Sequence, residues 1–97
     1  MTTGLIIAYY EALDEEVMEL LGKHNIKSYT KWTKVEGCGE ASGPHMLNTV
    51  WPKGNNVLFC VLEESYIAPL VDGFSKIRQE HLSEGLKVFQ IPVDILT

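Results

Sequence analysis

Possible ligands for a soft metal ion gather in one glycine-rich segment, residues 37–46. Cys38 supplies a thiol, Glu40 a carboxylate, His45 an imidazole and Met46 a thioether. Thiolate, thioether and imidazole groups suit copper(I), silver or zinc. The segment has neither a CxxC nor an HxxxH spacing, so the pattern favours packing or partner recognition by His45 and Met46. Metal binding by Cys38, His45 and Met46 is the alternative hypothesis.

A second group of candidate residues, Trp51-Pro52-Lys53, follows in the same part of the chain. A tryptophan beside a proline can anchor a protein partner or a neighbouring subunit, or it can pin the loop by packing. We expect Trp51 to join His45 and Met46 in a partner-binding loop. Lys53 is the basic residue of this loop nearest to any bound anion.

Catalysis finds little support in the residue pattern. The chain has no phosphate-binding loop of the Walker type and no nucleophile elbow. His24 and His81 are each expected near the end of a helix, where an imidazole interacts favourably with the helix dipole. We therefore expect a protein that is not an enzyme.

Composition limits the class of partner. The chain has 97 residues, with 13 acidic and 8 basic side chains and a net charge of −5. Nucleic-acid binding needs a clustered basic face, which this pattern lacks. No apolar stretch approaches the roughly 20 residues that span a bilayer, and no signal peptide is recognisable. With 2 cysteines, too few for a disulfide framework, we expect one cytoplasmic domain, residues 1–97, that neither binds nucleic acid nor inserts into a membrane.

Hydrophobic periodicity predicts the elements that position these residues. The expected strands are residues 4–10, 28–36, 56–62 and 86–95. One helix is expected to begin with Asp14 as its N-cap and to end at Asn25 in the left-handed conformation. The other is expected to begin with Ser65 as its N-cap and to carry Pro69 in its first turn. Residues 37–54 form a loop, and loops this long are usually functional or disordered.

The order of these elements predicts an α+β, ferredoxin-like fold. Strand–helix–strand–strand–helix–strand gives a four-stranded antiparallel sheet with both helices on one face. The first and third strands, which are central in that fold, are apolar on both sides. In the third strand, one face would carry Val57, Phe59 and Val61, and the other Leu58, Cys60 and Leu62. Two helices cover only one face, so we expect copies of the same chain to cover the other.

Two short motifs resemble the P-II (GlnB-like) family of nitrogen-regulatory signalling proteins. Val35-Glu36-Gly37-Cys38-Gly39 is similar to the turn that begins the long T-loop of that family, and Val88-Phe89-Gln90-Ile91-Pro92-Val93 is similar to its closing strand. Leu13-Asp14 also stands at the first helix as it does there. The resemblance implies a homotrimer that binds an adenine nucleotide or a small anion between subunits. Its T-loop would dock onto a transporter, channel, enzyme or regulator.

The same resemblance implies which residues bind the ligand, and it implies a divergent branch. The ligand-binding positions would be Gly37, Cys38, Gly39, Glu40, Lys53, Gly85 and Lys87. Glu40-Ala41 replaces the Arg-Gln of typical members, and the T-loop tyrosine has no counterpart here. The phosphate-binding B-loop is reduced to Ser83-Glu84-Gly85-Leu86-Lys87. We therefore expect weak or absent binding of magnesium-ATP with 2-oxoglutarate, whereas a monophosphate nucleotide or a small anion remains compatible.

Three functions follow from this reasoning. The leading hypothesis is a trimeric sensor whose ligand, held between subunits, controls the partner-binding loop. The first alternative is a soft-metal-binding or metal-responsive trimer, similar to CutA proteins, that uses His45, Met46 and Cys38. The second alternative is an enzyme built on a dimeric α+β barrel. The number of subunits and the identity of a retained ligand would distinguish the three.

Overall fold

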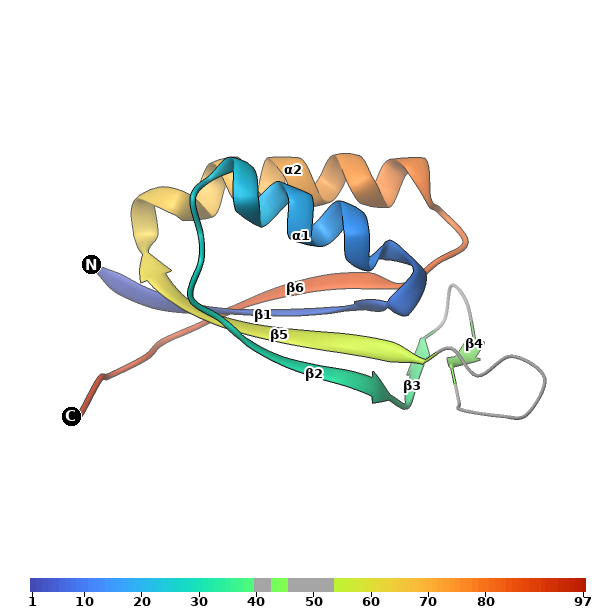
Figure 1. The fold of residues 1–97 in the computed structure, drawn as a ribbon, viewed down its shortest axis with the longest axis horizontal. Helices are drawn as coiled ribbons and strands as arrows, with labels where there is room; N and C mark the ends of the chain where they lie inside the picture. The colour runs from blue at the N-terminus through green and yellow to red at the C-terminus, as the bar shows by residue number, and fades with distance from the viewer. Residues whose placement is uncertain (40–42, 46–53) are drawn as a thin grey trace.

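A four-stranded antiparallel sheet with both helices on one side forms the body of the protein (Figure 1). The computed structural model describes residues 1–97 except residues 40–42 and 46–53. The strands of the large sheet are β1 (Thr2–Tyr10), β2 (Thr30–Val35), β5 (Asn55–Glu63) and β6 (Leu86–Ile91). Their order is β2-β5-β1-β6. The predicted ferredoxin-like fold, with the first and third of its strands in the centre, is therefore confirmed.

The core lies between this sheet and the helices α1 (Asp14–Lys23) and α2 (Ile67–Glu80). Alternate residues of the central strands point toward the helices and are buried, namely Leu5, Ile7 and Tyr9 of β1 and Leu58 and Cys60 of β5. The helices contribute the buried side chains Val17, Leu21, Leu70, Phe74 and Ile77. Each such apolar side chain contributes roughly 1.5–3 kcal/mol on burial. No helix in the described part of the chain is long and apolar enough to cross a membrane.

Both helices begin differently from the sequence prediction. A 3₁₀ turn, η1 (Glu11–Leu13), precedes α1, and another, η2 (Glu64–Tyr66), precedes α2. The residues at the N-cap positions are Leu13 and Tyr66, and neither makes a capping hydrogen bond through its side chain. The predicted N-caps Asp14 and Ser65 are therefore wrong, because Asp14 is already helical and Ser65 lies inside the 3₁₀ turn.

Two other backbone predictions about the helices are confirmed. Asn25 follows α1 with a φ of 57°, the left-handed conformation that ends a helix. Pro69 lies in the first turn of α2, where its missing N–H costs little. The described residues of the loop predicted at 37–54 are not all irregular. They include a short antiparallel ladder of β3 (Gly37–Gly39) and β4 (Gly43–His45).

The face of the sheet opposite the helices remains apolar and open. In the middle of this face, Ile6 of β1 pairs with Phe59 of β5 on one side and with Phe89 of β6 on the other. Trp32 of β2 pairs with Val57 in the next row. Phe89 is 51% exposed and Trp32 is 50% exposed. A single chain therefore leaves large apolar side chains of this face half exposed.

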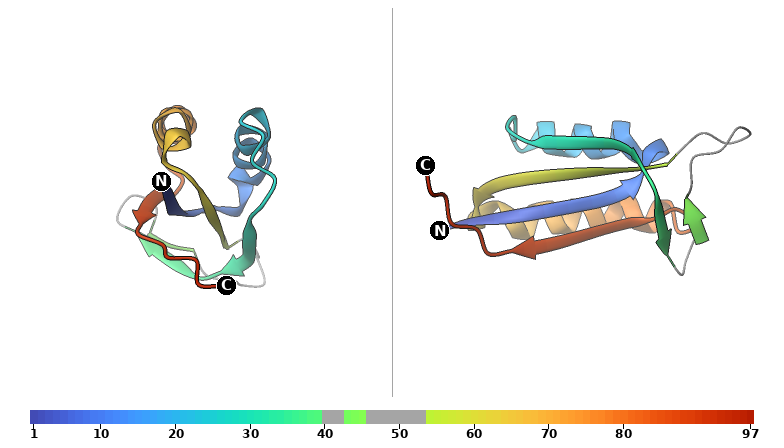
Figure 2. Two further views of the ribbon diagram at one scale, coloured as in Figure 1. Left: turned by 90° about the vertical axis from the view of Figure 1, so that its left-hand side faces the viewer. Right: turned by 90° about the horizontal axis from the view of Figure 1, so that it is seen from below.

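The chain after β6 folds across one end of the open face. β6 ends at Ile91, short of the predicted residue 95, because Pro92 has no N–H with which to extend the ladder. A Cβ atom added to Gly4 would lie 2.6 Å from Cγ2 of Val93. Gly4 therefore makes room for Val93 against the sheet. Figure 2 shows this tail passing below the strands, on the side away from the helices. The predicted edge position of β6 is confirmed.

Candidate functional site

Several loops meet at the end of the sheet where β1 finishes (Figure 1). The backbone N–H of Tyr10 donates to the carbonyl oxygen of Gly85 at 2.9 Å, and the N–H of Glu11 donates to that of Gly54, also at 2.9 Å. These bonds tie the chain before β6 and the chain before β5 to consecutive residues of β1. β2 reaches the same end, because Val35 pairs with Asn55 at the start of β5. We call this region the loop end of the sheet.

The structure brings the described residues predicted to bind a ligand to this end. Gly37–Gly39 form β3, directly after β2. Gly85 accepts the hydrogen bond from Tyr10. Lys87 is the second residue of β6 and pairs with Ala8. Segments far apart in the chain, around 37–39 and 85–87, therefore lie at one end of the sheet, whereas ligand binding by them stays a prediction.

Four of the predicted site residues lie outside the described part of the chain, namely Glu40, Met46, Trp51 and Lys53. Within the ladder of β3 and β4, Gly37 is opposite His45 and Cys38 is opposite Pro44. The ladder places the backbone of His45 near that of Cys38. Soft-metal binding by Cys38, His45 and Met46 stays a prediction.

Arg78 lines a groove together with Lys87 and adds a second positive charge there. The sequence analysis did not identify Arg78 as a candidate residue. The groove, about 340 Å³ in volume, lies between α2 and β6. Its lining includes Lys87 and Arg78, with apolar side chains such as Phe74 and Phe89. An apolar surface with two cations suits a ligand that combines a flat ring or alkyl part with an anionic group. Helical periodicity could have placed Arg78 one turn from the buried Phe74, but it could not have shown that both face β6.

A larger hollow of about 620 Å³ lies around the chain termini and the end of β6. Its charged lining side chains are the acidic Glu64 and Asp94. The amino group of Met1, which also lines it, is paired with Glu63. This hollow is therefore less suited to binding an anion than the groove beside Lys87.

A polar network holds the loop end of the sheet to α1. Asp14 accepts a hydrogen bond of 2.6 Å from the Tyr9 hydroxyl and one of 3.2 Å from Nδ2 of Asn56. Nζ of Lys31 lies 2.6 Å from the same carboxylate oxygen. Tyr9 and Asn56 are direct neighbours across β1 and β5. The network therefore joins three strands to the first residue of α1.

The electrostatics of this network favour a structural role over proton transfer. Burial raises the pKa of the Tyr9 hydroxyl, and the hydrogen bond to Asp14 raises it further. Burial alone would raise the pKa of Asp14, but hydrogen bonds from Lys31 and Tyr9 outweigh it and lower that pKa. The proton therefore stays on tyrosine and the carboxylate stays ionised near neutral pH. A catalytic acid or base would instead need a pKa close to the working pH.

Buried oxygen atoms at the loop end have unused capacity to accept hydrogen bonds. Oε2 of Glu11, Oδ1 of Asn55 and Oδ1 of Asn56 have no hydrogen-bond partner among the residues that the structure describes. Buried polar atoms are normally paired, and leaving one unpaired costs roughly 1–3 kcal/mol. These three atoms suit N–H or O–H donors from a loop or a bound molecule.

Solved structures with a similar fold belong to PII-like proteins. The chain is similar to CPII, a nitrogen regulatory PII-like protein from Thiomonas intermedia K12, in a structure with ADP, AMP and bicarbonate (TM-score 0.77, 23% identity, covering 96% of this chain and 89% of that chain). It is also similar to CPII bound to ADP, AMP and acetate (TM-score 0.67, 26% identity, covering 97% and 89%).

A PII-like signalling protein from Thermus thermophilus is similar as well (TM-score 0.60, 18% identity, covering 96% and 88%). No protein-family model and no curated protein matches the sequence. The likeness is therefore one of fold: the chain has the ferredoxin-like fold of the PII-like proteins. The resemblance that the short motifs indicated is confirmed at this level.

Proposed function

We propose that this chain is a PII-like regulatory protein, rather than an enzyme, that senses an adenine nucleotide alone or together with a small anion. Structures of CPII, which shares the fold, contain ADP, AMP and bicarbonate or acetate. The second structural relative is named as a signalling protein. The proposal includes action in the cytoplasm on a protein partner such as a transporter or another regulator.

One observation carries the proposal: the hydrogen bonds from Tyr10 and Glu11 tie Gly85 and Gly54 to the same end of β1. A ligand held at this end would contact the segment before β6 and the two ends of the 37–54 loop at once. Ligand binding could then order that loop, which is how switching segments commonly respond to small molecules. The loop would present His45, Met46 and Trp51 to the partner.

Lys87 is the residue that we assign to the anionic part of the ligand. It is exposed at the start of β6 and lines the same groove as Arg78. A lysine ammonium supplies a point charge to phosphate or carboxylate oxygens. Backbone amides of Gly37–Gly39 and Gly85 would add donors, and Lys53 would add charge from the loop.

We infer that further copies of the chain cover the open face of the sheet, because it is apolar and the helices cannot reach it; the resemblance to P-II proteins implies that the assembly is a homotrimer. Phe89 and Trp32 on that face are each about half exposed, and the tail that contacts Gly4 covers only one end. Exposed apolar surface of this kind is typical of an interface. The ligand would then lie in a cleft between subunits.

Isothermal titration calorimetry of the tag-free chain tests the ligand. We expect AMP and ADP to bind, with bicarbonate or acetate altering the affinity, and magnesium-ATP with 2-oxoglutarate to bind weakly or not at all. Binding of 2-oxoglutarate that strengthens magnesium-ATP would contradict the divergent ligand set. Absence of heat with every nucleotide and anion would contradict the proposed sensor.

A further inference from the structure

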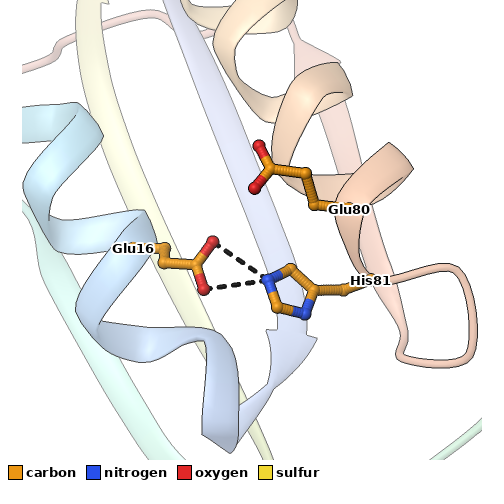
Figure 3. Close-up of side chains that lie close together, drawn as sticks. All are labelled: Glu16, Glu80 and His81. Atoms are coloured by element: carbon orange, nitrogen blue, oxygen red, sulfur yellow. Dashed lines mark hydrogen bonds and ion pairs between the residues drawn. The ribbon is translucent and has the colours of Figure 1, made fainter.

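Three side chains of types that can bind a metal ion lie close together at the ends of two helices. None of them belongs to the proposed ligand site. Glu16 lies in the first turn of α1, and Glu80 and His81 lie at the end of α2 (Figure 3). Nε2 of His81 is 2.9 Å from Oε1 and 3.1 Å from Oε2 of Glu16. One ligand atom from each of the three residues lies within 4.8 Å of the others. We propose that Glu16, Glu80 and His81 bind a divalent transition-metal ion, with zinc as the best match.

Charge balance at this cluster supports a cation. A further carboxylate, that of Glu84, lies 3.7 Å from Nδ1 of His81. Within the described part of the chain, no lysine or arginine forms an ion pair with any of these three glutamates. Oxygen atoms of Glu16 and Glu80 lie within 4.8 Å of each other; carboxylates this close repel one another, and a bound divalent cation removes that repulsion.

The ligand chemistry selects the class of metal. One imidazole nitrogen with carboxylate oxygens suits zinc and similar first-row ions, whereas magnesium and calcium prefer oxygen ligands alone. His81 and Glu16 are partly exposed, with 30% and 42% of their side chains accessible. An ion can therefore reach the cluster from solvent, and water completes its coordination shell. This site is distinct from the one predicted at Cys38, His45 and Met46.

Glu84 would orient the histidine rather than bind the metal. Binding through Nε2 requires the lone pair on that nitrogen and the proton on Nδ1. Any proton on Nε2 leaves to solvent. A small shift of the Glu84 carboxylate from its present 3.7 Å would then let it accept the Nδ1–H, the arrangement common behind metal-bound histidines. With zinc bonds of roughly 2.0–2.2 Å, the contact between Nε2 and Glu16 opens by a few tenths of an ångström. Side chains this exposed can make that adjustment.

The site would couple the two helices to the loop before β6. The N–H of Glu84 donates to the carbonyl of His81 at 3.0 Å, and the next residue, Gly85, is bound by Tyr10. A metal on His81 would therefore hold this turn in place next to Lys87. It would also draw the charge of Glu84 toward His81. This consequence for ligand affinity rests on the proposed function, whereas the metal site itself does not.

Titration of the tag-free chain with zinc chloride tests the site. We expect one zinc ion to bind per chain, and His81→Ala and Glu16→Gln each to weaken binding by at least about tenfold. His24→Ala, a change in a histidine at the end of the other helix, is the matched control and should leave the affinity unchanged. Circular dichroism confirms that each variant is folded.

The visible absorption of bound cobalt(II) reports which atoms bind the metal, and a change in folding alone does not produce these bands. We expect visible absorption bands for cobalt(II) bound to the wild-type chain and their loss in His81→Ala. Glu84→Gln should weaken binding while keeping the bands, because Glu84 orients the ring. Equal zinc affinity in wild type and His81→Ala would overturn the proposal, as would loss of binding in His45→Ala instead. Failure of nucleotide binding alone would leave these metal results unchanged, so the two proposals are tested separately.

Discussion

The backbone N–H of Tyr10 donates a hydrogen bond of 2.9 Å to the carbonyl oxygen of Gly85. Tyr10 ends the central strand β1, and Gly85 stands just before the edge strand β6. Through this bond, a central strand of the sheet positions the loop that precedes Lys87. The neighbouring bond from Glu11 to Gly54 positions the end of the 37–54 loop in the same way. A ligand at this place would meet segments whose relative positions are already set.

Lys87→Ala should weaken AMP and ADP binding by roughly ten- to a hundredfold, because charge-assisted hydrogen bonds contribute about 1.5–3 kcal/mol. Calorimetry with each nucleotide measures the change. Lys76→Ala is the control, since Lys76 is an exposed lysine of α2 that pairs with Asp72 and lies outside the groove. Equal losses in both variants would point to general charge attraction instead of a site at Lys87.

Tyr9→Phe should lower the free energy of unfolding by about 1.5 kcal/mol, since the hydroxyl of the buried Tyr9 donates to the ionised, partly buried carboxylate of Asp14. Lys31 and Asn56 still satisfy Asp14 in the variant, which keeps the loss at the lower end of the range. Urea denaturation measures it. Tyr66→Phe, at a tyrosine that is 37% exposed, should change stability by less than about 0.5 kcal/mol. Indistinguishable urea denaturation curves for wild type and Tyr9→Phe would contradict a stabilising role for the hydrogen bond between Tyr9 and Asp14.

The stability contributed by Asp14 should depend on pH in the acid range. Folding lowers the pKa of Asp14 below its ordinary value of 3.8, so the unfolded chain binds a proton more readily than the folded one. The contribution is therefore complete above the unfolded-state pKa and is lost as pH falls through the lower folded-state pKa. Asp14→Asn should be less stable than wild type at neutral pH, and the difference should shrink below about pH 4. A difference that stays constant with pH would contradict the assigned ionisation.

Phe89→Lys should dissociate the assembly, because it places an ammonium group in the middle of the apolar face beside Ile6. Sedimentation equilibrium should then report a smaller species than wild type. Ala68→Lys is the control, since Ala68 is exposed on α2, on the helix side of the sheet, and lies outside the groove beside Lys87. If Phe89→Lys sediments like wild type while Ala68→Lys dissociates, the interface lies on the helices and the open face is not the contact.

Sequence patterns predicted the strands and their order well because burial imposes a period on the residues. The central strands β1 and β5 alternate between core and open face along their length, and the helices cover Leu58 and Cys60 on the core side. Burial on the core side also raises the pKa of the Cys60 thiol. The helices were predicted from the same kind of spacing.

The sequence patterns did not predict contacts between distant segments of the chain. Asp14 has the residue type of an N-cap, but Tyr9, Lys31 and Asn56 all engage its carboxylate from the strands. The approach of Val93 to Gly4 and of His81 to Glu16 depends on packing between segments that are far apart in the chain. Periodicity describes one element at a time, so it gave no indication of these pairs.

Native mass spectrometry tests the central claim most directly, because it reports subunit number and bound ligand together. The tag-free chain would be sprayed as purified and again after addition of AMP or ADP. We expect a trimer that gains up to one nucleotide per subunit, and a smaller gain for Lys87→Ala than for Lys76→Ala. A monomer or dimer that gains no nucleotide would contradict both the assembly and the proposed sensing function.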